Sequence, residues 1–123
     1  MTETVLQWLA GVEGLQGLKP EQLDAASGSC GLFCKGEQLL WEKRDILGGR
    51  LRRRKRTFLL VIHRPAGSLC PMETIAQKAL ASAPVFGEDQ TVAMENARLS
   101  RDTGLGIARH QMEITFTFTT KEV

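Results

Sequence analysis

Cysteine and histidine are the residues of this chain with the most versatile chemistry, and they are few. The cysteines are Cys30, Cys34 and Cys70, and the histidines are His63 and His110. A cysteine beside a histidine can act as a nucleophile with its base, and Cys34 or Cys70 could pair with His63 in that way. No spacing among the five matches a zinc-ligand motif. We therefore expect reduced cysteines in a cytosolic protein, with Cys34 packed as a small core residue and no metal or cofactor.

Motifs that bind phosphate or activate a serine are absent from the sequence. It contains no G-x-x-x-x-G-K-[ST] and no G-x-S-x-G. The run GLGIA at 104–108 lacks the later glycine of a dinucleotide-binding loop and leads into an expected strand instead of a helix. Because an enzyme needs acid–base or nucleophilic groups at defined spacing, we expect a protein that is not an enzyme.

The strongest local feature is the basic run RLRRRKR at 50–56. Six of its seven residues are basic: Arg50, Arg52, Arg53, Arg54, Lys55 and Arg56. The formal net charge of the whole chain is only +2, so the chain without this run is acidic. The basicity is therefore local, which is typical of a contact patch or of a solvated loop.

Three interpretations of the basic run remain open. Its side chains could contact nucleic-acid phosphates and release counterions, although no aromatic residue interleaves with the arginines to stack on bases. They could instead dock against an acidic surface of a neighbouring subunit, which the acidic remainder of the chain would provide. They could also form a solvated hairpin that has no partner.

Two helices are predicted from apolar spacing. The first covers 4–16, where apolar residues recur at i, i+3, i+4 and i+7, and Thr4 and Gln7 could form a capping box at its start. The second begins at Pro71 and ends at about Ser82. Its apolar face should consist of Met72, Ile75, Ala76, Ala79 and Leu80.

The central part of the chain shows the periodicity of strands. A short strand is predicted at 32–35, followed by a long hairpin over 37–64. The hairpin should be buried at 58–62 and should project a charged, exposed tip around Gly48-Gly49. In its basic part, alternate residues should point to opposite faces, both in contact with solvent, with Arg52, Arg54 and Arg56 on one face and Arg53 and Lys55 on the other.

Two further strands complete the predicted fold. One is expected at 90–100, and strict alternation from Met112 to Phe118 predicts a last strand with one buried face. The chain is therefore expected to form a single α+β domain over 1–123. Its architecture should be a mainly antiparallel sheet with two helices packed on one face and a long charged hairpin in the middle. No apolar stretch approaches the roughly 20 residues of a membrane span, so no membrane contact is expected.

Three segments together resemble the small tail terminator proteins (tail-completion or minor capsid proteins) of long-tailed bacteriophages and prophages. They are the first amphipathic helix around VLQWLAGV, the central strands DILGGRLRRRKRTFLLVIHR, and the close ARHQMEITFTFTTKEV with its pattern A-R-x-x-x-x-I-T-F-T-F. The three segments are spread along most of the chain, from residue 5 to residue 123.

The resemblance implies a structural role in the virion tail, with assembly in the bacterial cytoplasm. Such proteins form a ring, usually of six subunits, at the head-proximal end of the tail tube. The ring stops polymerisation of the tail tube protein and presents a surface to the head connector protein. The six basic residues of 50–56 would then contact a neighbouring subunit or the tail tube. Because DNA passes through the tail lumen, the same residues could alternatively touch phosphates, as in a small nucleic-acid-binding module.

Overall fold

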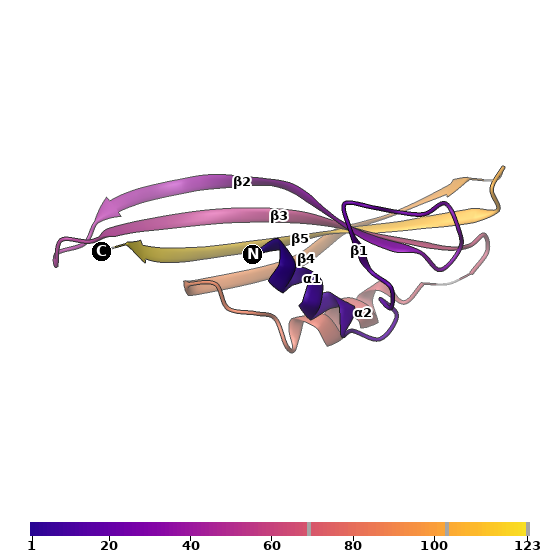
Figure 1. Cartoon of the computed structure of the whole chain (residues 1–123), viewed down its shortest axis with the longest axis horizontal. Coiled ribbons are helices and arrows are strands. Elements are labelled where there is room, and N and C mark those ends of the chain that lie inside the picture. The colour runs from indigo at the N-terminus through magenta and orange to yellow at the C-terminus, as the bar shows by residue number, and fades with distance from the viewer. Residues whose placement is uncertain (69, 103, 123) are drawn as a thin grey trace.

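A long sheet of five strands with two helices on one face makes up the fold, which confirms the predicted α+β class (Figure 1). The computed structural model describes residues 1–68, 70–102 and 104–122. In chain order the elements are α1 (Thr2–Ala10), β1 (Lys19–Pro20), β2 (Cys30–Arg44), β3 (Arg50–Pro65), α2 (Met72–Leu80), β4 (Glu88–Asp102) and β5 (Ile107–Glu122).

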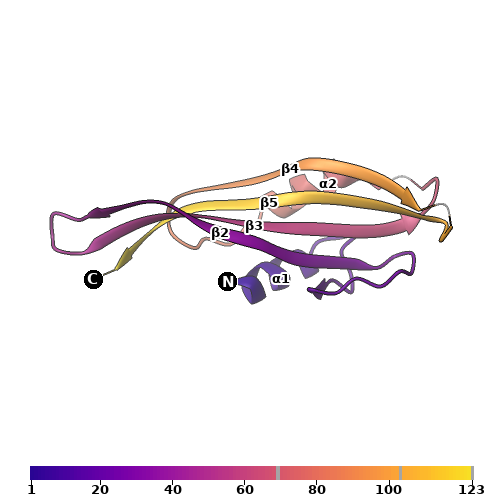
Figure 2. The same cartoon turned by 90° about the horizontal axis from the view of Figure 1, so that it is seen from above.

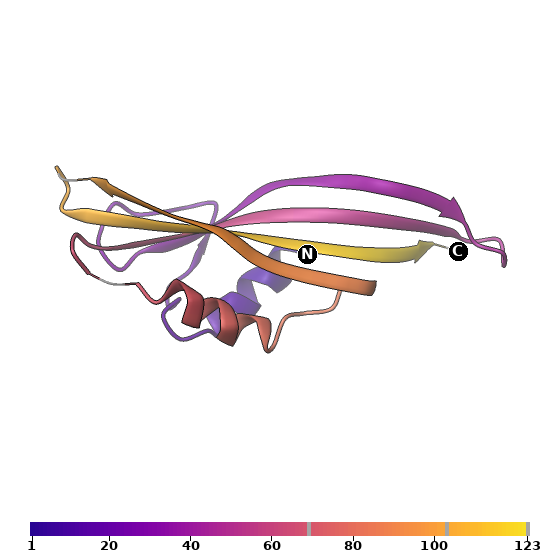
Figure 3. The same cartoon turned by 180° about the vertical axis from the view of Figure 1, so that it is seen from behind.

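The strands lie in the order β1-β2-β3-β5-β4, so the last strand is inserted beside the central one. The short β1 pairs parallel to β2, and every other pairing is antiparallel. Because β3 and β4 both run antiparallel to β5, they are parallel to each other on its two sides, and α2 makes the crossover between them. This crossover brings α2 back onto the same face of the sheet as α1 (Figure 3).

The hydrophobic core lies between the two helices and the sheet face formed by alternate residues of β3 and β5. Phe58, Leu60 and Ile62 of β3 are buried there, beside Ile114 and Phe116 of β5. The alternation predicted for the last strand is therefore confirmed. The two helices are joined directly, since the indole Nε1 of Trp8 donates a hydrogen bond of 2.9 Å to the carbonyl oxygen of Ala79.

The first helix is shorter than predicted and has a different start. It ends at Ala10, with Gly11 as its C-cap, and Gly14 and Gly17 adopt positive φ angles in the turns that follow. The prediction of a helix to residue 16 is wrong because Val12 and Leu15 are buried from these turns instead. The Thr4–Gln7 capping box is also wrong, since the helix begins at Thr2 and Met1 is its N-cap.

The predicted short strand and the first strand of the hairpin are one continuous element, β2. Its register relative to β3 shifts twice, between Cys34 and Gly36 and between Leu39 and Trp41. With these shifts β2 stays paired with β3 from its apolar beginning to its charged end. Cys34 is exposed, so its prediction as a core residue is wrong. In α2, Met72, Ile75, Ala76 and Ala79 are buried as predicted, but Leu80 is exposed, so its place on the apolar face is wrong.

The segment 21–29 covers the sheet face opposite the helices. Its backbone is tied to β3, since the amide of Gly28 donates to the carbonyl of His63 at 2.7 Å and the amide of His63 donates to the carbonyl of Ser29 at 2.8 Å. It passes so close to β2 that a Cβ atom on Gly31 would meet the carbonyl oxygen of Gln22. Glycine at position 31 is therefore what allows this segment to lie against the sheet.

Replacing Gly31 by alanine is expected to lower the free energy of unfolding by about 1 to 3 kcal/mol, because the new methyl group displaces backbone. Gly11→Ala is the matched control, since its Cβ would be 3.6 Å from the nearest atom and its φ of −81° suits alanine. That control should be neutral or stabilising by up to about 1 kcal/mol. Denaturant unfolding measures the free energy of unfolding of both variants. Equal values for Gly31→Ala and Gly11→Ala would contradict the close passage of segment 21–29 beside β2.

Candidate functional site: a charged three-stranded arm

The basic run lies in β3 along a part of the sheet that extends past the helices (Figure 2). β5 continues beside β3 as far as the pair Arg50 and Glu122, whereas β4 pairs with β5 only up to Thr119. Beyond that point the sheet consists of β2, β3 and β5 alone. We call the charged end of the sheet, residues 37–56 and 119–122, the arm; its outer part, from Arg50 to Arg52 in β3, is this three-stranded extension. The hairpin is confirmed, but its basic strand is the middle one of three instead of an isolated tip.

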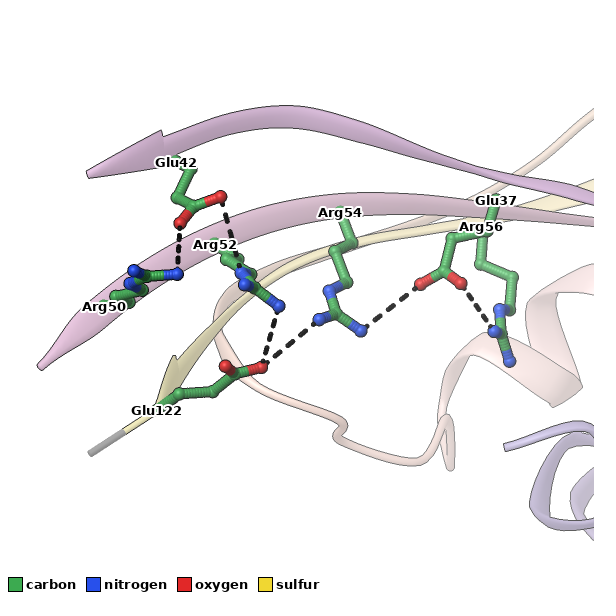
Figure 4. A network of polar contacts seen from close by, with 7 residues as sticks. All are labelled: Glu37, Glu42, Arg50, Arg52, Arg54, Arg56 and Glu122. Carbon is green, nitrogen blue, oxygen red and sulfur yellow. Dashed lines mark hydrogen bonds and ion pairs between the residues drawn. The ribbon is translucent and has the colours of Figure 1, made fainter. Parts of the chain in front are cut away.

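One face of the arm carries a row of alternating arginines and glutamates (Figure 4). Arg52, Arg54 and Arg56 share this face, as predicted from alternation. Arg52 and Arg54 each lie between a carboxylate of β2 and one of β5, and Arg56 pairs with a carboxylate of β2 alone. We call this row of ion pairs the charge ladder; its order is Arg50, Glu42, Arg52, Glu122, Arg54, Glu37 and Arg56.

Each glutamate of the charge ladder bridges two arginines. Glu122, from β5, lies 3.2 Å from Arg52 and 3.5 Å from Arg54. Glu37, from β2, lies 3.6 Å from Arg54 and 2.8 Å from Arg56. The ladder therefore ties the two outer strands of the arm to the central one.

The second glutamate from β2 completes the ladder near the turn. Glu42 lies 3.5 Å from Arg50 and 3.6 Å from Arg52. The Arg52 side chain is only 27% exposed, less than expected for a face in full contact with solvent, because it packs between the flanking strands. Single exposed ion pairs contribute little, but a connected row of half-buried pairs favours one arm geometry.

The remaining two basic residues point to the other face of the arm. Arg53 donates to Thr119 Oγ1 at 2.9 Å and to the carbonyl oxygen of Asp89 at 3.1 Å, so its guanidinium is engaged within the chain. Lys55 is exposed and, among the described residues, makes no ion pair within 4 Å. On the same face, the Lys43 ammonium lies 4.9 Å from the centre of the Trp41 ring.

The arm is basic although its arginines are paired. It holds nine basic and four acidic residues, a formal charge of +5, and the rest of the chain therefore carries −3. Three of the four carboxylates belong to the charge ladder. The excess positive charge of the arm therefore lies around the turn and on the face opposite the ladder. This separation of charge gives the molecule a basic end and an acidic body, which can steer association between copies.

The turn of the arm is held by an ion pair between β5 and the end of β2. The Asp45 carboxylate lies 2.6 Å from the Lys121 ammonium. The hydrogen bond from Lys121 lowers the pKa of Asp45, against the opposing effect of desolvation, and Asp45 in turn raises the pKa of Lys121. A carboxyl whose folded-state pKa is lowered stabilises the fold above its ordinary value, and this contribution is lost as pH falls through the folded-state value.

Replacing Lys121 by methionine is expected to raise the pKa of Asp45 towards its ordinary value, because the first cause of the depression is removed. Carboxyl carbon chemical shifts followed through an acid titration measure this change. Lys35→Met is the control: it should raise the pKa of Glu113, whose depression comes first from Lys35, and leave Asp45 as it is. If the titration midpoint of the Asp45 carboxyl group were the same in Lys121→Met as in the wild-type chain, the ion pair at the turn would be contradicted.

The glutamates of the ladder were missed by sequence reasoning, although part of the signal was present. A hairpin centred on Leu47 places Glu42 opposite Arg52, which is the observed register. Glu37 lies opposite Arg56 because the register shifts by one residue between Leu39 and Trp41. No sequence signal indicates that Glu122 lies beside the arm, since that depends on β5 inserting next to β3.

Neither Cys34 nor Cys70 contacts His63 as the nucleophile of the pair considered from the sequence, and the thiol of Cys70 instead donates to Met72 Sδ at 3.5 Å. Cys34 pairs with Phe58, and His63 is five residues further along β3, about 16 Å away. Both nitrogens of His63 are engaged, Nδ1 with the carbonyl oxygen of Asp24 at 2.8 Å and Nε2 with Arg109 Nε at 3.1 Å. Over residues 1–68, 70–102 and 104–122, no group of three His, Cys, Asp or Glu side chains could hold a metal ion.

No protein-family model matches this chain, and no curated protein matches it significantly. Within the part of the chain that the structure describes, neither helix has the length and apolar character needed to cross a membrane.

Proposed function

We propose that this protein is a structural assembly protein, the tail terminator of a long-tailed bacteriophage or prophage. Its copies join by head-to-tail contacts into a ring, of six subunits in the resembled family, at the head-proximal end of the tail tube. The ring stops polymerisation of the tube protein and joins the tail to the head connector. The protein works in the virion tail and is assembled in the bacterial cytoplasm.

The observation that supports this proposal best is the arm. It extends past the two-layer part of the fold, is braced across three strands by the charge ladder, and carries a net positive charge opposite an acidic body. A ring needs two different surfaces on each subunit that complement one another. A basic arm and an acidic body on one chain are two such surfaces.

The alternative, a nucleic-acid-binding module, is less well supported because the arginines are already engaged. Arg50, Arg52, Arg54 and Arg56 face carboxylates, and Arg53 donates to Thr119 and Asp89. Phosphate contacts by these residues would have to replace those interactions. Of the six predicted contact residues, Lys55 alone is exposed without an ion pair to another described residue, so we assign the subunit or tail-tube contact first to Lys55 and the partly exposed Arg50.

Reversing the two accessible charges, Arg50→Glu with Lys55→Glu, is expected to weaken self-association and binding to tail tubes by about 10-fold or more. The matched control is Lys19→Glu with Lys78→Glu, which changes the net charge equally but on the body, where each lysine makes a surface ion pair. Sedimentation measures self-association, and tail length in an assembly reaction measures termination.

Equal assembly and equal tail lengths for the arm variant and the wild-type chain would contradict the proposal. The nucleic-acid alternative predicts a different result. Wild-type protein would then bind DNA at about 50 mM salt and lose that affinity by powers of ten on raising the salt to about 200 mM.

A further inference from the structure

Two strands of the sheet have a free edge, and the two edges lie on opposite sides of the sheet (Figure 3). β4 pairs with β5 on one side and, among the described residues, has no strand on the other. β2 pairs with β3, and on its outer side β1 covers only Gly31 and Leu32. A free edge presents unpaired backbone N–H and C=O groups, which can pair with a strand of another chain.

The two free edges carry opposite charges. β4 begins with Glu88 and Asp89, and its first eight residues contain three acids and no basic residue. β2 ends with Lys43 and Arg44. In the part of the chain that the structure describes, none of these four side chains makes an ion pair within 4 Å. Unlike the charges of the ladder, their charges are therefore free to meet a second chain.

Each free edge also carries an apolar side chain on the helix side of the sheet. Leu39 of β2 is 52% exposed and lies opposite Arg54 of β3. Val92 of β4 is partly exposed and lies opposite Phe116, which itself lies opposite Arg56 of β3. The two arginines share one face of β3, so the two apolar side chains are on that face as well.

The apolar and charged residues have the same spacing on both edges. From Leu39 to Lys43, β2 advances three positions along β3, from 54 to 51, because it contains one extra residue at a register shift. From Val92 back to Glu88, β4 advances three positions along β5, from 116 to 119, again with one extra residue. An antiparallel pairing that places Val92 beside Leu39 therefore also places Glu88 beside Lys43. Three is an odd number of positions, so both charged side chains lie on the face opposite the helices.

We infer that β4 of one copy pairs antiparallel with β2 of the next copy, over residues 88–95 and 36–43, so that the sheet continues from copy to copy. Neighbouring strands in the order β2-β3-β5-β4 alternate in direction, so β4 runs opposite to β2 and meets it antiparallel in a neighbour of the same orientation. The opposite charges of the two edges favour a second copy as the partner. This inference rests on the proposed function and names the two surfaces of its head-to-tail contact.

The length of the pairing is limited at one end by both copies. β4 changes register relative to β5 between Glu95 and Arg98. On the neighbour, β1 covers the edge of β2 at Leu32, a few residues beyond Gly36. The contact joins two different edges, so every added copy presents one free β4 and one free β2. An interface of this kind propagates from copy to copy and ends only when the rotation closes a ring.

Reversing the charges of each edge, separately and together, tests the contact. Glu88→Lys with Asp89→Lys changes the β4 edge, and Lys43→Glu with Arg44→Glu changes the β2 edge. All four side chains are exposed, so both variants should fold. Each is expected to weaken self-association, measured by sedimentation, by about 10-fold or more, because like charges then face one another. The chain with all four changes is expected to associate within about 3-fold of wild type, since opposite charges face one another again.

A disulfide between copies tests the register. In chains with the exposed Cys34 replaced by serine, a mixture of Lys43→Cys and Glu88→Cys is expected to form a cross-linked dimer on mild oxidation, because directly paired residues lie within disulfide reach. Within one copy the two positions are three strand spacings apart, about 14 Å or more, so no internal disulfide can form. Arg98→Cys is the matched control for Glu88→Cys. Arg98 is also exposed on β4 but lies beyond the paired segment, so its mixture with Lys43→Cys should give no cross-link.

The outcomes separate this inference from the proposed function. Rings formed by the two single-edge variants as readily as by wild type would overturn the inference and leave ring formation to other surfaces. Failure of the four changes to restore association, or equal cross-linking of Lys43→Cys to Arg98→Cys and to Glu88→Cys, would overturn the pairing of these two edges. A wild-type chain that stays monomeric at every concentration and on added tail tubes would overturn both the inference and the proposed function.

Discussion

Replacing Phe116 by alanine is expected to lower the free energy of unfolding by about 3 to 5 kcal/mol. Phe116 is fully buried at the centre of the core. Its ring makes edge-to-face contacts with Trp8, Phe58 and Phe86, at centroid distances of 5.7, 6.2 and 5.2 Å. Truncation therefore removes apolar contacts with both the helix and the sheet, and the rigid surroundings cannot close the cavity. A typical domain has only about 5 to 15 kcal/mol of stability in total.

Denaturant unfolding at a concentration where the chain is monomeric measures this loss. Phe33→Ala is the chemically matched control, because Phe33 is only partly buried and lies on the other face of the sheet, where it lines a pocket with Leu59 and Val61. Its expected cost is about 1 to 2 kcal/mol. Equal costs for the two phenylalanines would contradict the position of the core between the helices and one sheet face.

Replacing Glu37, Glu42 and Glu122 by glutamine is expected to open the arm while the core stays folded. The change removes six ion pairs of the charge ladder and raises the formal charge of the arm from +5 to +8. Exposed pairs contribute about 0.2 to 1 kcal/mol each, so losing six of them should cost the arm about 1 to 6 kcal/mol of local stability. Amide protons of its strands should then exchange about 10- to 100-fold faster.

The same triple variant should also gain affinity for nucleic acid, because its arginines lose their partners in the chain. Binding to DNA at low salt, absent in wild type and lost on adding salt, is the expected result. The control is Glu13→Gln with Glu88→Gln and Glu95→Gln, which makes an equal charge change on the body. Unchanged amide exchange in the arm of the ladder variant would show that the glutamates do not brace it.

The sequence predicted the elements whose pattern is local. The alternation from Met112 to Phe118 identified the last strand and its buried face. The turn at Gly48-Gly49, between an apolar and a basic stretch, identified the long hairpin. Side-chain alternation also predicted correctly that Arg52, Arg54 and Arg56 lie on one face of the sheet and Arg53 on the other. These features depend on backbone periodicity, which a sequence displays directly.

The features that the sequence did not predict depend on contacts between distant segments. Pairing of Arg50 with Glu122 joins residues that are 72 positions apart, and no local pattern indicates it. The length of the first helix was overestimated because Val12 keeps the helical spacing while lying in a turn after Gly11. The pocket between Leu23 of segment 21–29 and Val61 of β3 likewise depends on this segment folding back over β3.

The native mass of the purified protein shows whether the arm joins copies of this chain into a ring. Light scattering over a range of concentrations, with absorbance read at the protein and nucleic-acid wavelengths, gives both mass and bound nucleic acid. We expect a nucleic-acid-free species near six times the subunit mass of 13.6 kDa, in solution or on added tail tubes. A monomer or dimer that carries nucleic acid, released by salt, would contradict it.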